Sequence, residues 1–347
     1  AVTVQGRLSK TAPVSARDNF RELDEFLKAT PLLIYDGPFS GHLENRKPLG
    51  IRGTAITADQ ARRVALRFTG IGNVPVANVA VRESKGVTPA YICTISAPTT
   101  APRPAVPPGT AMPPASLVRS PAPAVRGTAP YFPGSEAIVA VSKVGGKVLW
   151  SIDNRAVTSV PSGTRNLIPG IAGTARTPSG AVTPPARTRP ISMEAAFDRA
   201  KSFLSSKGFK NMEMIGSVVQ QHILTASFVP KQDGIILYPD LVKVAVNLLG
   251  GRVVGFDASE YYASHRPRVL PTPTLTAAEA RRLVSNNLSV ISTRRALIPL
   301  PSRREVLTYE FRGKRGKDEY LVYINALNGD EEMILQVLRT PQGVMTK

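Results

Sequence analysis

Apolar residues recur at helical spacing in three places along the chain, each time directly after a hydroxyl side chain that can cap a helix. Thr57 and Gln60 have the spacing of a capping box, and so do Thr276 and Glu279. Ser192 lacks an acid or amide at the third helical position, so its cap is simpler. This pattern predicts three amphipathic helices of roughly three to four turns each.

A second pattern follows each predicted helix, in which alternating apolar residues run into a short turn. Residues 139–146 align without gaps on residues 244–251, and more loosely on residues 322–329. The turn residues, which tolerate positive φ, are Gly145, Gly146, Gly250, Gly251, Asn328 and Gly329. We therefore expect an α+β fold of three tandem units, each a helix packed on an antiparallel sheet of three to four strands.

Proline interrupts this pattern at two places. Residues 97–134 contain eleven prolines and residues 156–190 contain six, with no Asp or Glu in either stretch. Because such sequences favour extended, solvated chain, we interpret both as disordered. The number of residues from helix cap to final turn is largest in the first unit. Leaving out residues 97–134 makes this number similar in all three units. The first stretch is therefore interpreted as an insertion within the first unit.

The predicted organisation follows from these boundaries. Its parts are a lead-in at 1–52 with an amphipathic helix at 15–30, a first unit at 53–155, a linker at 156–190, a second unit at 191–267 and a third unit at 268–347.

Charge and composition bear on partners and compartment. The chain has 44 Lys and Arg against 25 Asp and Glu, a formal net charge of +19, which favours acidic surfaces or polymers as neighbours. A single cysteine, Cys93, excludes an intramolecular disulfide and a cysteine-rich zinc site. No apolar run is long enough to span a bilayer, and residues 1–10 lack the apolar block of a signal peptide. We expect this chain to lack a membrane anchor.

The sequence contains no GxSxG, HExxH or GxxxxGKS/T motif, so it offers no standard nucleophile, zinc or phosphate-loop chemistry. The histidines His42, His222 and His265 stand apart, and His222 is interpreted as a structural histidine within a strand. Cys93 is expected to be a buried free thiol in a strand. No catalytic, cofactor-binding or metal-binding residue is predicted.

Three further features have both a functional and a structural interpretation. The acidic residues 330–332 could bind a metal, but a solvated hairpin tip is favoured because one edge offers too few converging oxygens. The densest basic region consists of Arg303-Arg304 and Arg312–Lys317. These segments contain no interleaved aromatics and acids interrupt the region, so a solvated or wall-facing edge is favoured over nucleic-acid binding. Trp150 is expected to pack on the helix of its own unit.

Four blocks of sequence carry a resemblance to a known family. They are Leu32–Ser40, Gly145–Trp150 with Asn154 and Arg155, Val253–Ala258, and the stretch from Ala296 to Asn325. Repeated helix-plus-hairpin units of this kind resemble PepSY domains, and the chain is similar to the C-terminal portion of the spore germination protein YpeB family.

The resemblance implies an extracytoplasmic protein of the endospore inner membrane or cortex. It further implies a role, together with a spore cortex-lytic enzyme of the SleB type, in the breakdown of cortex peptidoglycan. We interpret the chain as a non-enzymatic accessory protein that binds, stabilises or restrains that enzyme and needs no cofactor. Two alternatives stay open: a module that binds a cell-wall or nucleic-acid polyanion, and a cortex hydrolase with paired carboxylates in one cleft.

Overall fold

The computed structural model describes residues 48–85, 87–96, 135–156, 190–300, 302, 304–340 and 343–346. The predicted helix at 15–30, the insertion at 97–134 and nearly all of the linker at 156–190 lie outside the described residues.

The first two predicted helices begin at their predicted caps. Helix α2 (Ala58–Thr69) starts with a complete capping box, because Thr57 accepts from the Gln60 N–H and the Gln60 side chain accepts from the Thr57 N–H. Helix α3 (Met193–Ser206) starts at Ser192, whose side chain accepts from a backbone N–H three residues later.

The third predicted helix also has its capping box, between Thr276 and Glu279, but α5 (Ala277–Leu283) has only 7 residues. The predicted length of three to four turns is wrong for this helix. Val284 adopts an extended conformation, with φ −80° and ψ 137°, and its side chain is buried in the core. The chain therefore leaves the helix early because packing of Val284 favours the extended backbone. The shorter helices are η1 (Val76–Asn78), η3 (Asn154–Ala156) and α4 (Ser259–Ser264).

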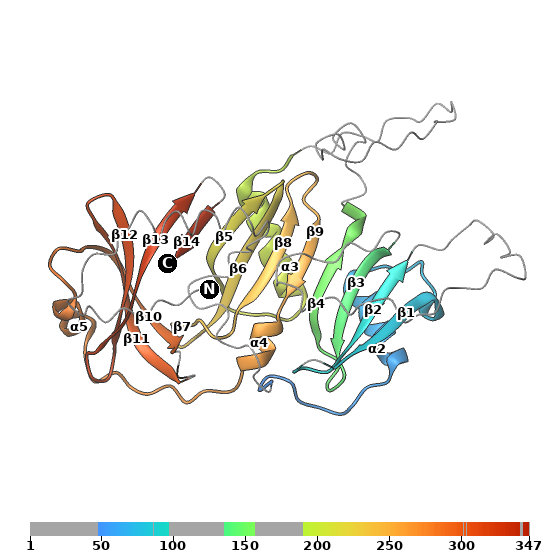
Figure 1. Cartoon of the computed structure of the whole chain (residues 1–347), viewed down its shortest axis with the longest axis horizontal. Helices are drawn as coiled ribbons and strands as arrows, with labels where there is room; N and C mark the ends of the chain where they lie inside the picture. The colour runs from blue at the N-terminus through green and yellow to red at the C-terminus, as the bar shows by residue number, and fades with distance from the viewer. Residues whose placement is uncertain are drawn as a thin grey trace, which may run out of the picture.

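Among the described residues, the strands form one 14-stranded sheet with the order β1-β2-β3-β4-β9-β8-β6-β5-β14-β13-β12-β11-β10-β7 (Figure 1). In chain order they are β1 (Val79–Ser84), β2 (Ala90–Ser96), β3 (Ser135–Ser142), β4 (Val148–Asp153), β5 (Met212–Gln220), β6 (Ile223–Gln232), β7 (Ile235–Leu237), β8 (Val242–Asn247), β9 (Val253–Asp257), β10 (Ser289–Pro299), β11 (Glu305–Arg315), β12 (Asp318–Asn325), β13 (Glu331–Thr340) and β14 (Gly343–Thr346).

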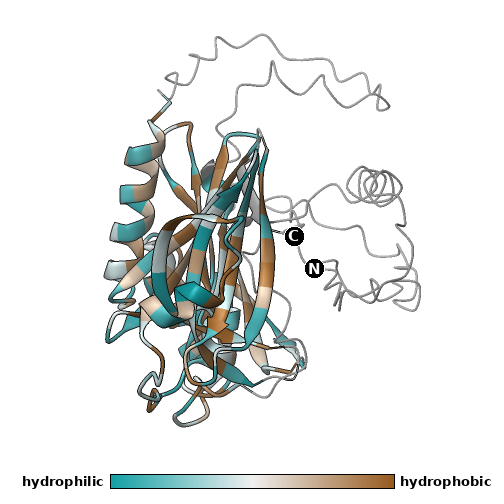
Figure 2. Cartoon of the chain, turned by 90° about the vertical axis from the view of Figure 1, so that its left-hand side faces the viewer, coloured by the Kyte–Doolittle hydropathy of each residue, from teal (hydrophilic) through white to brown (hydrophobic). Residues whose placement is uncertain are grey.

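The strands that follow α2 and those that follow α3 join through their last members. Strands β4 and β9 pair antiparallel, with Trp150 opposite Asp257 and Ile152 opposite Gly255. Ala65 of α2 and Leu204 of α3 belong to the same buried cluster, so both helices cover one face of this part of the sheet. Figure 2 shows a long helix standing against one side of strands that carry both apolar and polar residues.

Aromatic side chains hold the two helices together on that face. The rings of Phe68 in α2 and Phe203 in α3 meet edge to face, with centroids 5.8 Å apart. The Lys207 ammonium lies 4.4 Å from the centre of the Phe68 ring and donates to the Phe68 carbonyl at 2.6 Å. Burial lowers the pKa of Lys207 from its ordinary value.

In the described part of the chain, strands β5 to β7 and β10 to β14 pair into a closed ring. Strand β6 pairs with β5 and β8, and its last residues, Lys231 and Gln232, also pair with β7. Strand β7 then pairs in parallel with β10 at Arg295–Leu297. The pairings therefore run in a ring through β6, β5, β14, β13, β12, β11, β10 and β7.

The interior of this ring is a core of its own, and its largest fully buried side chains include Tyr323 and Ile298. Helix α5 packs outside, against a second cluster that includes Phe311 and Ile324. The sequence predicted antiparallel strands unit by unit, and it predicted neither the short parallel strand β7 nor the merging of all strands into one sheet. Three residues carry too little pattern to be recognised as a strand.

The predicted glycine turns lie between paired strands. Gly145 and Gly146, between β3 and β4, have φ of 70° and 60°, and Gly250 and Gly251, between β8 and β9, have 95° and 71°. Gly329 has φ of 83° and follows Asn328 in the turn between β12 and β13. In the described part of the chain, no helix is long and apolar enough to cross a membrane.

The insertion should be removable without loss of the fold. Ser96 at the end of β2 pairs directly with Ser135 at the start of β3, so a short loop can join them. Replacing residues 97–134 with a short Gly-Ser loop should leave the free energy of unfolding within about 1 kcal/mol, because loop-closure entropy changes slowly with length. Thermal unfolding of the shortened and full chains measures this, and loss of the cooperative transition would contradict it.

Gly145 should tolerate a side chain less well than a glycine with similar φ in open space. A Cβ at Gly145 would overlap the carbonyl oxygen of Arg52, whereas Gly316 has φ of 62° and no atom within 4 Å of the added carbon. Gly316→Ala should cost about 1 kcal/mol for the positive φ alone. Gly145→Ala should cost more, because backbone must move. Urea unfolding compares the two variants, and equal losses would show that the contact with Arg52 is unimportant.

Candidate functional site

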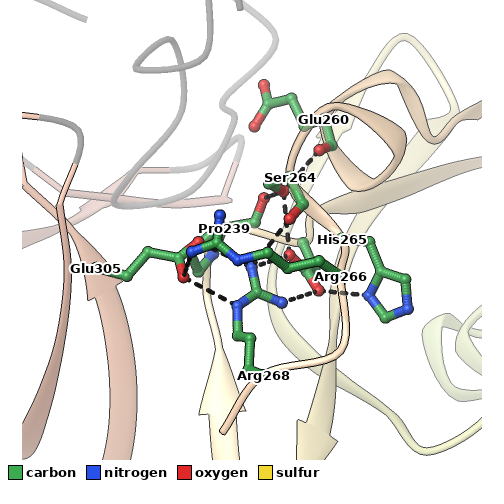
Figure 3. A network of polar contacts seen from close by, with 8 residues as sticks. Pro239, Glu260, Ser264, His265, Arg266, Arg268 and Glu305 are labelled. Atoms are coloured by element: carbon green, nitrogen blue, oxygen red, sulfur yellow. Dashed lines mark hydrogen bonds and ion pairs between the residues drawn. The ribbon is translucent and has the colours of Figure 1, made fainter. Parts of the chain in front are cut away.

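A buried aspartate lies where the chain passes from β7 to β8. Asp240 is fully buried and is bound by the guanidinium of Arg268, with Nη1 2.8 Å from Oδ2 and Nη2 2.7 Å from Oδ1 (Figure 3). This two-pronged geometry matches the planar guanidinium to the carboxylate, which makes it among the stronger ion pairs that proteins form.

The end of helix α4 supplies two more contacts to the same carboxylate. The Ser264 hydroxyl lies 3.0 Å from Oδ1 of Asp240, and Nδ1 of His265 lies 2.6 Å from Oδ2. The His265 ring also stacks on Tyr261, with centroids 4.2 Å apart. The carboxylate of Asp240 is therefore held by a serine, a histidine and an arginine at once.

Arg268 connects this aspartate to the start of β11. Its Nη2 lies 2.9 Å from Oε1 of Glu305 and its Nε lies 3.0 Å from Oε2, while Arg266 donates to Oε2 of the same carboxylate at 2.9 Å. The Arg268 side chain is only 3% exposed. One buried guanidinium thus joins the strands after α3 to those after α5, which is visible in Figure 3 as a chain of contacts from Glu305 to His265.

Burial and hydrogen bonding oppose each other in this cluster. Burial alone would raise the pKa of Asp240, but hydrogen bonds from His265 and Arg268 and the charge of Arg268 hold it below its ordinary value. Burial would likewise lower the pKa of Arg268, yet hydrogen bonds to Glu305 and Asp240 raise it. Both groups are therefore charged at neutral pH.

Serine, histidine and aspartate together suggest a hydrolase, but their arrangement does not form a nucleophile and base. In a serine triad the hydroxyl bonds to the imidazole, and the aspartate bonds to the other ring nitrogen. Here the Ser264 hydroxyl and His265 Nδ1 both contact Asp240. The cluster can hold backbone segments together, and it does not activate the serine.

A second network lies at the mouth of the ring. Glu310 is only 1% exposed. The Tyr238 hydroxyl lies 2.5 Å from its Oε2, and Nη2 of Arg294 lies 2.5 Å from its Oε1. Arg294 also donates to Glu213 at 3.0 Å, and Lys231 contacts that same glutamate at 2.5 Å. Burial, with the charge of Glu310, raises the pKa of Tyr238 well above its usual range. Two basic and two acidic side chains therefore alternate from the ring interior to the surface.

Two residues discussed from the sequence lie in different places than predicted. His222 is exposed, with φ of 66°, and forms the two-residue turn between β5 and β6 with Gln221, so its placement within a strand is wrong. Trp150 pairs with Ala140, which belongs to a cluster with Ala90 on the sheet face away from α2. The expected packing of Trp150 on its helix is therefore wrong. The cause is a bulge between β3 and β4, next to the Ala140–Trp150 pair, which shifts the register of the two strands.

Other candidates match their structural interpretation. Cys93 is a fully buried free thiol in β2, and burial raises its pKa to about 11. Asp330 and Glu331 are exposed beside their turn, as a solvated hairpin tip requires. The basic residues Lys314 and Arg315 are exposed at the end of β11, and Lys317 is exposed in the turn to β12. His42 lies outside the described residues.

The sequence did not reveal the Asp240 cluster. Arg268 is 28 residues from Asp240 and 37 residues from Glu305, so no local spacing joins them. The Arg-Pro-Arg stretch at 266–268 was the only available signal, since a proline between two arginines suggests a fixed rather than a freely moving segment.

The Asp240 cluster should make the fold sensitive to acid. The pKa of Asp240 is lowered in the folded chain, so its contribution is complete above the unfolded value of about 3.9 and is lost as pH falls through the folded value. Asp240→Asn should cost about 3 kcal/mol at pH 7, because it leaves Arg268 buried with one partner fewer. The difference from the parent chain should shrink as pH falls below about 4.

Urea unfolding between pH 7 and pH 3 measures this difference. Asp330→Asn, in an exposed turn, is the matched control and should leave the free energy of unfolding nearly unchanged. A pH-independent difference for Asp240→Asn would show that its charge is not what stabilises the cluster.

Comparison with known proteins identifies the family and the fold. The family model described as YpeB sporulation, PepSY1 and PepSY2 domains matches residues 16–105 and 184–271. Sporulation protein YpeB of Bacillus subtilis (strain 168) is 38% identical over 146 residues, which are 42% of this chain and 32% of that protein. The same-named protein of Halalkalibacterium halodurans is 38% identical over 144 residues, which are 42% of this chain and 32% of that protein.

The matched part spans about a third of the length of these curated relatives. A solved structure, the Bacillus megaterium YpeB C-terminal domain, superposes with a TM-score of 0.56 and 24% sequence identity. The superposition covers 82% of this chain and 99% of that one, so the α+β fold with its large sheet is shared.

Proposed function

Because the chain belongs to the YpeB sporulation protein family, we propose that it acts in spore germination as a non-enzymatic accessory protein that binds a cortex-lytic enzyme. The proposal concerns a noncovalent role: the chain holds the enzyme, and stabilises or restrains it until cortex breakdown begins.

One observation carries the non-enzymatic part of this proposal. Of the four buried carboxylates among the described residues, Asp240, Glu310 and Glu319 are each bound by arginine, and Glu260 is the fourth. A glycoside hydrolase needs two carboxyl groups across one cleft, one of them kept protonated by a raised pKa. Burial would raise the pKa of Glu319, but hydrogen bonds from Arg312 and Arg339 lower it, as the partners of Asp240 do there. The lowered pKa values of Asp240 and Glu319 suit these two acids to binding arginine and not to donating protons.

The proposal includes three PepSY-like units. The family model covers parts of the first two, at 16–105 and 184–271. The third, at 268–347, has the same order of a capped helix, α5, followed by antiparallel strands β10–β13. We assign the same kind of unit to it on this order.

The proposed partner is an enzyme of the SleB type, and the proposed location is extracytoplasmic, at the endospore inner membrane or cortex. The formal charge of +19 supports an added attraction to acidic wall polymer, which would concentrate the chain near the cortex. Specific recognition of the enzyme would come from sheet edges and faces, since exposed charges mainly set encounter rate.

Spores and purified protein together test the proposal. Spores that lack the protein should lose or mislocalise their cortex-lytic enzyme, and the purified chain should release no fragments from cortex peptidoglycan. The enzyme itself is the positive control for digestion. Digestion by the purified chain would favour the hydrolase alternative, while normal enzyme levels in the deficient spores would contradict the accessory role.

The salt dependence of binding distinguishes the remaining alternative, a module that binds a polyanion. Capture of the enzyme by the purified chain should persist from about 50 to 500 mM salt, because the contact is not purely electrostatic. Polyglutamate serves as the polyanion control, and its binding should fall steeply over this range. Capture of the enzyme that falls as steeply as that of polyglutamate would favour the polyanion-binding module.

A further inference from the structure

The first half of β10 has a paired neighbour on only one side. Strand β10 pairs with β11 along its whole length, from Ser289 opposite Lys314 to Pro299 opposite Glu305. On its other side, the parallel strand β7 pairs only with Arg295–Leu297. Within the part of the chain that the structure describes, no strand pairs with residues 289–294 on that side. The ring therefore contains a free strand edge.

Backbone groups at this edge point outward. The Leu297 carbonyl accepts from the Tyr238 N–H at 3.1 Å, so the polar backbone groups of Leu297 face the β7 side. Because these groups alternate along a strand, those of Arg295 and Thr293 face the same side. Thr293 lies two residues before Arg295, which is paired with the first residue of β7, so its N–H and C=O face an edge that no described strand occupies; Ile291, two residues earlier, is 58% exposed.

A groove of about 560 Å³ adjoins this edge. Its lining includes the cations Lys231, Arg294 and Arg295 and the single acid Glu213, together with the apolar Ile236. The side chains of Lys231 and Arg294 are 42% and 35% exposed. Lys231 and Arg294 are ion-paired with Glu213, and Arg294 also with Glu310, so Arg295 leaves the groove with one net positive charge beside an edge that offers backbone hydrogen bonds.

We propose that residues 289–294 are a strand-addition site for an extended, acidic segment of a partner protein. An added strand would continue the line of β7 and hydrogen-bond with Thr293, while its acidic side chains meet Lys231 and Arg295. The inference deepens the proposed function and rests on it, because it states how the partner is held.

The positive charges at this edge disfavour pairing with a second copy of the chain. A second copy of this edge would bring Arg294 and Arg295 against their own counterparts, and like charges across a strand pair are unfavourable. An acidic strand avoids the charge repulsion.

Peptide binding to the full chain tests the site. The probe is a fluorescent seven-residue peptide, acetyl-Val-Glu-Val-Asp-Val-Glu-Val-amide, measured by anisotropy, with Gln and Asn replacing its acids in the matched control peptide. Thr293→Pro removes the N–H at the free edge, where proline is tolerated because that N–H does not bond to β11. Thr293→Val keeps the N–H and is the matched control.

The acidic peptide should bind the parent chain and Thr293→Val alike, and should bind Thr293→Pro at least tenfold more weakly. The neutral peptide should bind the parent at least tenfold more weakly than the acidic one at low salt. Equal binding to Thr293→Pro and Thr293→Val, or to both peptides, would overturn the proposal, as would no binding below millimolar concentration. If Thr293→Pro fails to fold, a peptide N-methylated at alternate amides replaces it, with the same tenfold loss expected.

Capture of the purified cortex-lytic enzyme separates this inference from the proposed function. Enzyme captured equally by the parent and by folded Thr293→Pro overturns the strand-addition site and leaves the accessory role standing. No capture by the parent chain contradicts the accessory role, whatever the peptide shows. Capture by the parent that is lost in Thr293→Pro and kept in Thr293→Val supports both.

Discussion

Strand β6 is the element on which the whole arrangement depends, because it is shared between two curved surfaces. It pairs with β8 as part of the sheet under α2 and α3, and with β5 and β7 as part of the closed ring. One strand therefore fixes how the ring sits against that sheet. Arg268 reinforces the junction, since its buried guanidinium joins Asp240, just before β8, to Glu305 in β11.

The charged residues divide into two groups with different roles. The acids are outnumbered by bases, 25 to 44, and several of them are used inside the fold: Asp240 and Glu305 bind Arg268, and Glu310 binds Arg294. Breaking such a pair is costly because it leaves a buried charge alone. The exposed surface consequently keeps an excess of positive charge, which suits acidic neighbours.

This distribution supports the proposed binding role. The protein's best-organised polar cluster holds Ser264 and His265 on the same carboxylate, so this serine and histidine are not arranged as a nucleophile and its base. The first half of β10, by contrast, combines a strand edge that no described strand pairs with and basic side chains beside it. Sheet edges of this kind can hold a partner through main-chain hydrogen bonds, with side chains supplying specificity.

The sequence by itself determined what depends on residues close together in the chain. The capping boxes at Thr57 and Thr276 and the burial of Cys93 follow from spacings of a few residues, and the structure confirms them. The α+β class and the family resemblance came from patterns of the same kind. Only the tertiary structure decided the early end of α5, the side of the sheet on which Trp150 lies, and the pairing of β7 with β10. It also decided the Asp240–Arg268–Glu305 contacts. Each of these is set by packing or pairing between residues far apart in sequence, and such contacts leave no periodic signal in one chain.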